Sequence, residues 1–170
     1  MGVVVKMEKT ENLEGLIKPL LGKKCWQARK GHGSFLTFDF GKVKIPSRPS
    51  RSRFGKKRML PAKGEWHLWI MMCEWVIKRH NIMIAHSESS DEDIENIVSQ
   101  IKGLKIEKIG FYQDSDDSLF VFENGYTIQT HPYEDGDEND EQWLLFTPNN
   151  YVISYANKNS WTYELSSKSK

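Results

Sequence analysis

Residues 66–77, WHLWIMMCEWVI, constrain the fold more than any other segment of the chain. Apolar side chains occupy both alternating faces of this segment, with Trp66, Leu68, Ile70 and Met72 on one face and Trp69, Met71, Cys73 and Trp75 on the other. A strand that is apolar on both faces is covered by protein on both sides. We therefore expect 66–77 to form a central strand with other layers packed above and below it.

Most of the remaining chain has the alternation and turn signals of short β-strands. The sequence predicts strands flanking the turn GHGS at 31–34, and further strands near 82–86, 104–112, 118–123, 126–131, 142–147, 150–156 and 161–165. Apolar residues at helical spacing predict two helices, at about 11–21 and 91–102. The expected fold is one α+β domain over 1–165, with a mostly antiparallel sheet of eight or nine strands, followed by a disordered tail at 166–170.

Composition excludes several protein classes. The chain has 170 residues, enough for one domain with a full core, and no apolar run approaches the roughly 18 residues of a membrane span. Cys25 and Cys73 lie in apolar, strand-like segments, which predicts buried and reduced thiols. We expect a cytoplasmic protein that needs no cofactor, no metal ion and no membrane; monomer and small homo-oligomer both remain open.

The near-zero net charge of +1 conceals a strong asymmetry between the two halves of the chain. Residues 1–80 contain 18 Lys and Arg against 6 Asp and Glu, whereas residues 81–170 contain 6 against 17. Such an asymmetry indicates either a dipolar surface that meets charged partners or two halves whose charges intersperse on folding.

The positive charge is concentrated in residues 42–63, which contain nine cations and no acid. The middle of this segment, 46–58, lacks periodicity, and we expect it to be a long loop. Clustered Arg and Lys can bind phosphates. This predicts a candidate nucleic-acid contact formed by Arg48, Arg51, Arg53, Lys56, Lys57 and Arg58.

The negative charge is concentrated in HPYEDGDENDEQ, residues 131–142. The segment fails the EF-hand pattern, because counting from Asp135 places Asp140 where glycine is required. It is either a solvated hairpin loop or a surface that docks on a basic protein. In the second case the expected contacts are the six carboxylates and two aromatic anchors, namely Glu134, Asp135, Asp137, Glu138, Asp140, Glu141, Tyr133 and Trp143.

The five histidines show no zinc-binding spacing. His67 lies within an apolar strand, which favours a buried histidine with its hydrogen bonds satisfied. His86, close to Glu88, is a candidate for acid–base chemistry, although a helix-capping turn accounts for the same residues.

Two segments carry a resemblance to a known family. CWQARKGHGSFLTFDFG at 25–41 and GEWHLWIMMCEW at 64–75, with WLLFTPNNYVISY further on, resemble a family of small bacterial proteins with no assigned activity. The resemblance implies a bacterial protein and transfers no catalytic residue. In size and organisation the chain is also similar to immunity proteins of bacterial toxin systems.

Three functions follow from these features. The first is a non-enzymatic module that binds a protein, as an immunity or inhibitor protein would, through its acidic loop. The second is nucleic-acid binding through the basic segment, and the third is an enzyme that uses a histidine and an acid.

Overall fold

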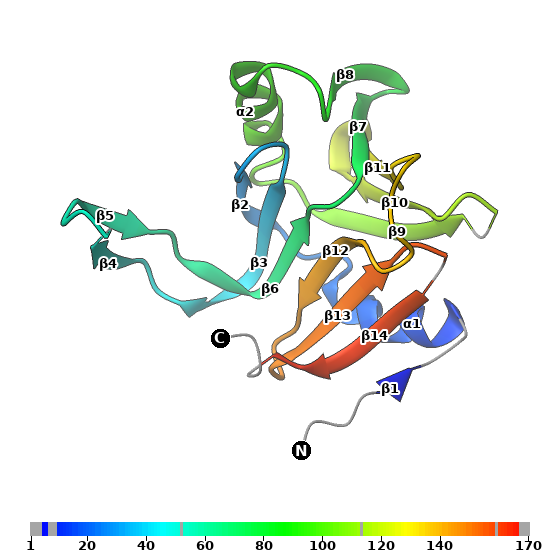
Figure 1. The fold of residues 1–170 in the computed structure, drawn as a ribbon, viewed down its shortest axis with the longest axis horizontal. Helices are drawn as coiled ribbons and strands as arrows, with labels where there is room; N and C mark the ends of the chain where they lie inside the picture. The colour runs from blue at the N-terminus through cyan, green and yellow to red at the C-terminus, as the bar shows by residue number, and fades with distance from the viewer. Residues whose placement is uncertain (1–4, 7–9, 52, 113, 159, 167–170) are drawn as a thin grey trace.

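The computed structural model describes residues 5–6, 10–51, 53–112, 114–158 and 160–166, and within them three antiparallel sheets and two α-helices (Figure 1). The seven-stranded sheet has the order β1 (Val5–Lys6), β14 (Ser160–Leu165), β13 (Tyr151–Ala156), β12 (Glu141–Phe146), β6 (Lys63–Ile70), β3 (Leu36–Ile45) and β2 (Cys25–Lys30). The five-stranded sheet has the order β8 (Ile82–His86), β7 (Glu74–Arg79), β11 (Tyr126–His131), β10 (Asp117–Phe122) and β9 (Ile106–Tyr112). The α+β, mostly antiparallel prediction is confirmed, but the described strands outnumber the eight or nine expected.

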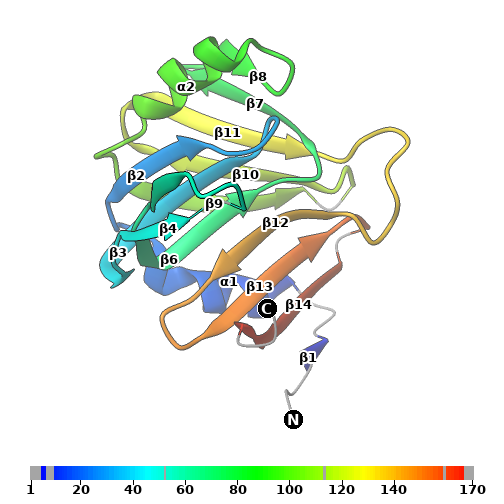
Figure 2. The ribbon, with the colours of Figure 1, turned by 60° about the vertical axis from the view of Figure 1, so that its left-hand side comes forward.

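The two larger sheets lie against each other (Figure 2). Aromatic residues on their inner faces make contacts between them. Phe38 of β3 meets Phe122 of β10 at a ring-centroid distance of 5.9 Å, and Trp143 of β12 meets Phe120 of β10 at 5.7 Å. The buried indole of Trp143 also donates a hydrogen bond to Ser118 Oγ at 3.0 Å, which ties the sheets together. Apolar area removed from water between these faces is the main source of stability.

The segment 66–77 is not one central strand, as the sequence predicted. It divides at 71–73, and its first part belongs to the seven-stranded sheet while its second part belongs to the five-stranded sheet. Trp66, Leu68 and Ile70 are buried before the break, and Cys73, Trp75 and Ile77 are buried after it. The buried positions change from even to odd numbers, so two one-sided strands in succession give the appearance of a single two-sided strand.

Both predicted helices form, and both are shorter than expected. α1 spans Thr10–Ile17 and passes into a 3₁₀ turn at Lys18–Leu20 that contains Pro19. α2 spans Asp91–Ser99, and the Ser90 side chain caps it by accepting a hydrogen bond from Asp93 N. α2 packs between β2 and β8, whereas α1 packs against β9. In the predicted disordered tail, Ser166 is hydrogen-bonded to Asn150, and 167–170 lie outside the described residues.

The segment 46–58, predicted as a long loop, forms most of a two-stranded arm. β4 (Arg48–Arg51) pairs with β5 (Lys57–Leu60), and the hairpin projects from the body as a continuation of β3 and β6 (Figure 1). The arm has no core beneath it, so its strands show no apolar alternation. The absence of that signal led sequence reasoning to a loop.

Candidate functional site

The arm carries cations on both of its faces. In the β4–β5 register, Arg48 is opposite Leu60 and Ser50 is opposite Arg58, and these pairs share one face. Arg51 is opposite Lys57 on the other face. All four cationic side chains are exposed, so the ribbon presents positive charge whichever side approaches a partner.

The tip of the arm combines charge with an exposed aromatic ring. Phe54 is 90% exposed, which is exceptional for an aromatic side chain, and it lies beside Arg53. Gly55 has φ +75°, a backbone conformation that glycine adopts without strain and that lets the chain reverse at this point. Met59, on β5, is also 62% exposed. Apolar side chains in this position contact a partner or remain in water, because the arm offers them no core.

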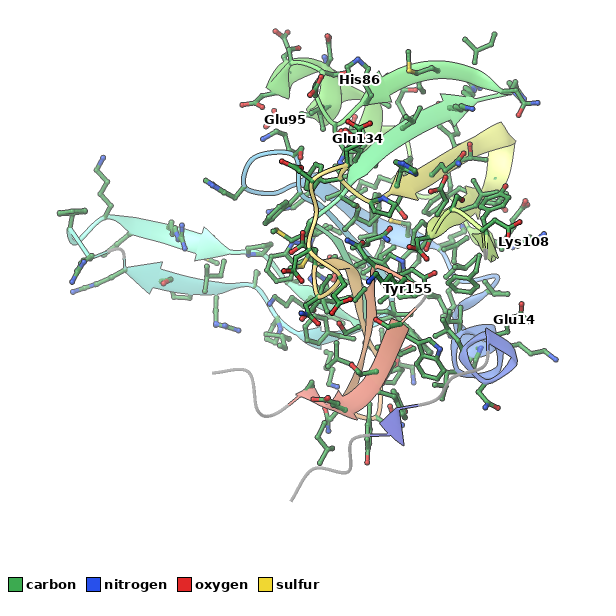
Figure 3. All side chains as sticks on the ribbon, turned by 45° about the vertical axis from the view of Figure 1, so that its right-hand side comes forward. Glu14, His86, Glu95, Lys108, Glu134 and Tyr155 are labelled. Atoms are coloured by element: carbon green, nitrogen blue, oxygen red, sulfur yellow. The ribbon has the colours of Figure 1, made fainter. Side chains whose placement is uncertain are left out.

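The arm cations and the acidic loop do not neutralise one another. Figures 1 and 2 show the arm and the loop between β11 and β12 in separate parts of the molecule, and Figure 3 places Glu134 away from the arm. Within the part of the chain that the structure describes, no ion pair uses Arg48, Arg51, Arg53, Lys57 or Arg58. The charge asymmetry of the sequence therefore becomes a dipolar surface.

The acidic loop is held by its own hydrogen bonds. Asp137 Oδ1 accepts from Asn139 N at 2.8 Å, and Asp140 Oδ2 accepts from Asp137 N at 3.0 Å. Glu138 pairs with Lys158 at 2.6 Å, and the hydrogen bond from this ammonium raises the pKa of Lys158. Several of the carboxylates predicted to meet a partner thus stabilise the loop itself, while Glu134 and Asp135 remain exposed.

The prediction of Trp143 as an aromatic anchor of the acidic loop is wrong. Trp143 is fully buried and stacks on Tyr155 with ring centroids 5.1 Å apart, because the alternation of β12 turns it inward together with Leu145. Tyr133 is half-buried, and desolvation raises the pKa of its hydroxyl. Of the remaining carboxylates, Glu141 is half-buried at the start of β12.

A row of side chains crosses the seven-stranded sheet at the root of the arm, where β3 and β6 lead into it. Gln27 on β2 is opposite Asp39 on β3, Asp39 is opposite His67 on β6, and His67 is opposite Phe146 on β12. This row occupies the outer face, since the neighbouring Phe38, Phe40, Trp66 and Leu68 line the inner face. Sequence reasoning did not find it, because the row depends on registers between strands that are distant in the chain.

Asp39 organises the row. Its carboxylate is fully buried and accepts from His67 Nδ1 at 2.7 Å, from Gly64 N at 2.8 Å and from Gln27 Nε2 at 2.9 Å. A side chain at Gly64 would come within 2.6 Å of Phe40 O, so glycine permits this close approach of the strands. These hydrogen bonds hold the carboxylate in place and fix the His67 ring with Nδ1 toward Asp39.

The other predicted residues have structural roles. His86 Nδ1 accepts from Glu88 N at 3.2 Å, as in the turn that was the alternative to acid–base chemistry. Cys25 and Cys73 are buried free thiols, as predicted, and desolvation raises the pKa of each to about 12. Thiols with such pKa values are poor nucleophiles.

Neither a metal site nor a membrane-spanning helix is found among the described residues. No group of three or more His, Cys, Asp or Glu side chains is placed to hold a metal ion, and no helix is long and apolar enough to span a membrane. Comparison of the chain with protein-family models, curated proteins and solved structures finds no match. The resemblance to a bacterial family therefore stays a prediction.

Proposed function

We propose that the protein binds duplex DNA through the β4–β5 arm. One observation carries the proposal: a two-stranded ribbon stands out from the body, bears exposed cations on both faces and ends in an exposed phenylalanine. This was the second of the three functions that the sequence suggested.

The dimensions of the arm suit a DNA groove. The major groove of B-DNA admits a two-stranded β-ribbon, and a four-residue strand is about 13 Å long. A ribbon inside the groove faces phosphates on both sides. The cations on both faces of the arm match that environment. Arg48 and Arg58 would meet one backbone and Arg51 and Lys57 the other. At the tip, Phe54 is free to stack on or wedge between bases.

The acidic half of the chain does not contradict this proposal. Domains that bind nucleic acid are usually basic overall, and this chain is not. The acids of the β11–β12 loop, however, lie apart from the arm, and part of their charge is neutralised by Lys158. Beyond a Debye length of roughly 8 Å at physiological salt, their repulsion of DNA is largely screened.

The test is fluorescence anisotropy of a labelled duplex of about 20 base pairs at about 50 mM salt. The arm variant R48A/R51A/R58A is expected to lose most of the affinity. A matched variant, K18A/K105A/K108A, removes the same charge from exposed positions around α1 and β9, and should bind as the parent does. Equal losses in both variants would show that overall charge, not the arm, governs binding, and preference for single strands would exclude a groove-binding mode.

The acidic loop supports a second candidate, a protein-binding module such as an immunity or inhibitor protein. The backbone hydrogen bond from Gly136 N to Tyr133 O, at 3.0 Å, closes a turn that presents the exposed Glu134 and Asp135 to a basic partner. Neutralising all six carboxylates should abolish recovery of such a partner in a pull-down, and unchanged recovery would exclude the loop. For either function we propose a cytoplasmic location, which agrees with two free, buried thiols.

A further inference from the structure

The outer face of the seven-stranded sheet has two small cavities at the root of the arm, and His67 lines both. One cavity has a volume of about 230 Å³ and is lined among others by Lys44, Lys63, Glu65, His67, Phe146 and Asn150. The other, of about 220 Å³, is lined by residues that include Gln27, Lys63, His67 and Trp69. His67 and Lys63 are common to both, so they lie where the two cavities adjoin.

One edge of the His67 ring is fixed and the other is available. Nδ1 is bonded to the buried Asp39, while Nε2 has no hydrogen-bond partner among the described residues. The side chain is only 11% exposed, and its exposure is to the cavities that it lines. The Nε2 edge of the ring is therefore open to the two cavities, where a ligand can meet it.

The charges around His67 determine which ligand fits. Asp39 on β3 is bonded to the ring, and Lys44 on β3 and Lys63 and Glu65 on β6 line the cavities with it. Lys23 lies 4.0 Å from Glu65. The residues contributed by β2, by β12 and by the chain that follows β12 are Gln27, Phe146, Thr147 and Asn150, and none of them is charged. Because Lys23 compensates Glu65, Lys44 and Lys63 stand against Asp39 alone, and this excess of one positive charge favours an anion.

The two acids and Lys44 are already occupied. Asp39 accepts three hydrogen bonds, Glu65 is paired with Lys23, and Lys44 donates to Asn150 Oδ1 at 2.5 Å and to the carbonyl of Pro148 at 3.3 Å. Lys63 is exposed and has no ion pair among the residues described. Lys63 and the Nε2 edge of His67 are therefore the two groups that remain for a ligand.

We propose that these cavities form a subsite for a DNA phosphodiester, held by Lys63 and by the Nε2–H of protonated His67. This proposal rests on the proposed DNA binding, because a duplex on the arm brings phosphates to the arm's root. The cavities accommodate a phosphate group and part of a sugar but no whole nucleotide pair. Since Nδ1 faces Asp39, Nε2 is the ring atom that can meet the phosphate.

The test records NMR correlation spectra of the histidine rings in the full chain during titration with dTpdT, a minimal DNA phosphodiester. Ring signals are assigned by replacing each of the other four histidines with Gln, so His67 itself is not altered. The expected result is a shift of the His67 signals while those of His131 stay fixed. Thymidine, which lacks the phosphate, should shift neither.

Two lysine variants sharpen the result. Lys63→Ala should weaken dTpdT binding severalfold, and Lys108→Ala, at the far side of the molecule in Figure 3, should leave it unchanged. His67 signals that do not respond to dTpdT, or that respond equally to thymidine, would overturn the subsite. Binding of inorganic phosphate without binding of dTpdT would overturn its assignment to DNA.

Failure of the subsite and failure of the arm are distinguishable. The variant R48A/R51A/R58A should lose duplex binding and still show the His67 shift with dTpdT. If the parent protein binds no duplex but dTpdT shifts His67, the arm's proposed function is overturned and the phosphodiester subsite stands. If the duplex binds but dTpdT leaves the His67 signals unchanged, the phosphodiester subsite is overturned and the arm's proposed function stands.

Discussion

The molecule has a basic end and an acidic end, and each contains an Asp–His pair. At the basic end, Asp39 lies 2.7 Å from His67 Nδ1, and at the acidic end Asp117 lies 2.5 Å from His131 Nδ1. Each aspartate also accepts a hydrogen bond from a glutamine, Gln27 or Gln129. The local chemistry of the two ends is nearly the same.

The surroundings of the two pairs differ. The His67 side chain is 11% exposed and lines cavities with lysines, whereas the His131 side chain is 54% exposed and stands opposite Glu74 at the start of the acidic loop. The outer nitrogen of His131 is on an open surface, whereas the outer nitrogen of His67 is reached only through the cavities. A hydrogen-bonded pair becomes a candidate site through burial and neighbouring charge, not through the pair itself.

The largest expected effect concerns the charge of the two ends. If the six arm cations contact phosphates, raising salt from about 50 to 200 mM should lower duplex affinity roughly a thousandfold. R48A/R51A/R58A should flatten the slope of log affinity against log salt by about 2.7, since each lost contact contributes about 0.9. Anisotropy titrations at several salt concentrations measure both values. A slope unchanged by the arm variant would place the phosphate contacts elsewhere.

Breaking the two pairs should have unequal effects on stability. Asp39→Asn places an amide NH₂ group against N–H donors that meet a carboxylate in the parent protein. Because the site is buried, we expect the free energy of unfolding to fall by about 3 kcal/mol. Asp117→Asn is expected to cost roughly 1 kcal/mol, since water can reach its partner. Urea unfolding followed by tryptophan fluorescence measures the difference. Equal losses would mean that the two pairs contribute alike to the fold.

The arm tip offers a variant that separates binding from folding. Phe54→Ala removes a ring that is 90% exposed, so the free energy of unfolding should change by less than about 0.5 kcal/mol. Duplex binding should weaken by roughly 1 to 3 kcal/mol if the ring stacks on bases. Anisotropy and urea unfolding of the same sample measure the two quantities. Unchanged affinity would mean that the arm contributes to duplex binding through its charge and not through the Phe54 ring.

Much of the sheet could be predicted from the sequence, because its strands have one buried face and so alternate. The predicted 126–131 agrees with β11, and Asn124 and Gly125 both adopt the positive φ expected of an Asn-Gly turn. The arm could not be predicted by the same rule, since a ribbon with no core has polar residues on both faces. The polar residues Gln27, Asp39 and His67 in apolar strands were a usable signal for the site, but only strand registers bring them into one row.

The smallest expected difference concerns the two glutamines. Gln27 Nε2 donates to Asp39 Oδ2 and to the carbonyl of Ala62, each at 2.9 Å, and so holds the end of the arm against the sheet. Gln129 Nε2 donates to Asp117 Oδ2 at 2.7 Å, beside solvent. A hydrogen bond contributes about 1 kcal/mol net to stability. Gln27→Ala should therefore lower the free energy of unfolding by about 1 to 2 kcal/mol, and Gln129→Ala should lower it by about half of that.

Hydrogen exchange can show where the Gln27→Ala effect acts. Faster exchange should be confined to the amides of 61–65 if Gln27 anchors the arm's root, and it should leave the β10–β11 pairing unchanged. Faster exchange throughout the seven-stranded sheet would instead mean that Gln27 contributes to global stability. In that case the arm's root is as rigid as the core, and the cavities beside His67 are preformed and do not open with the arm.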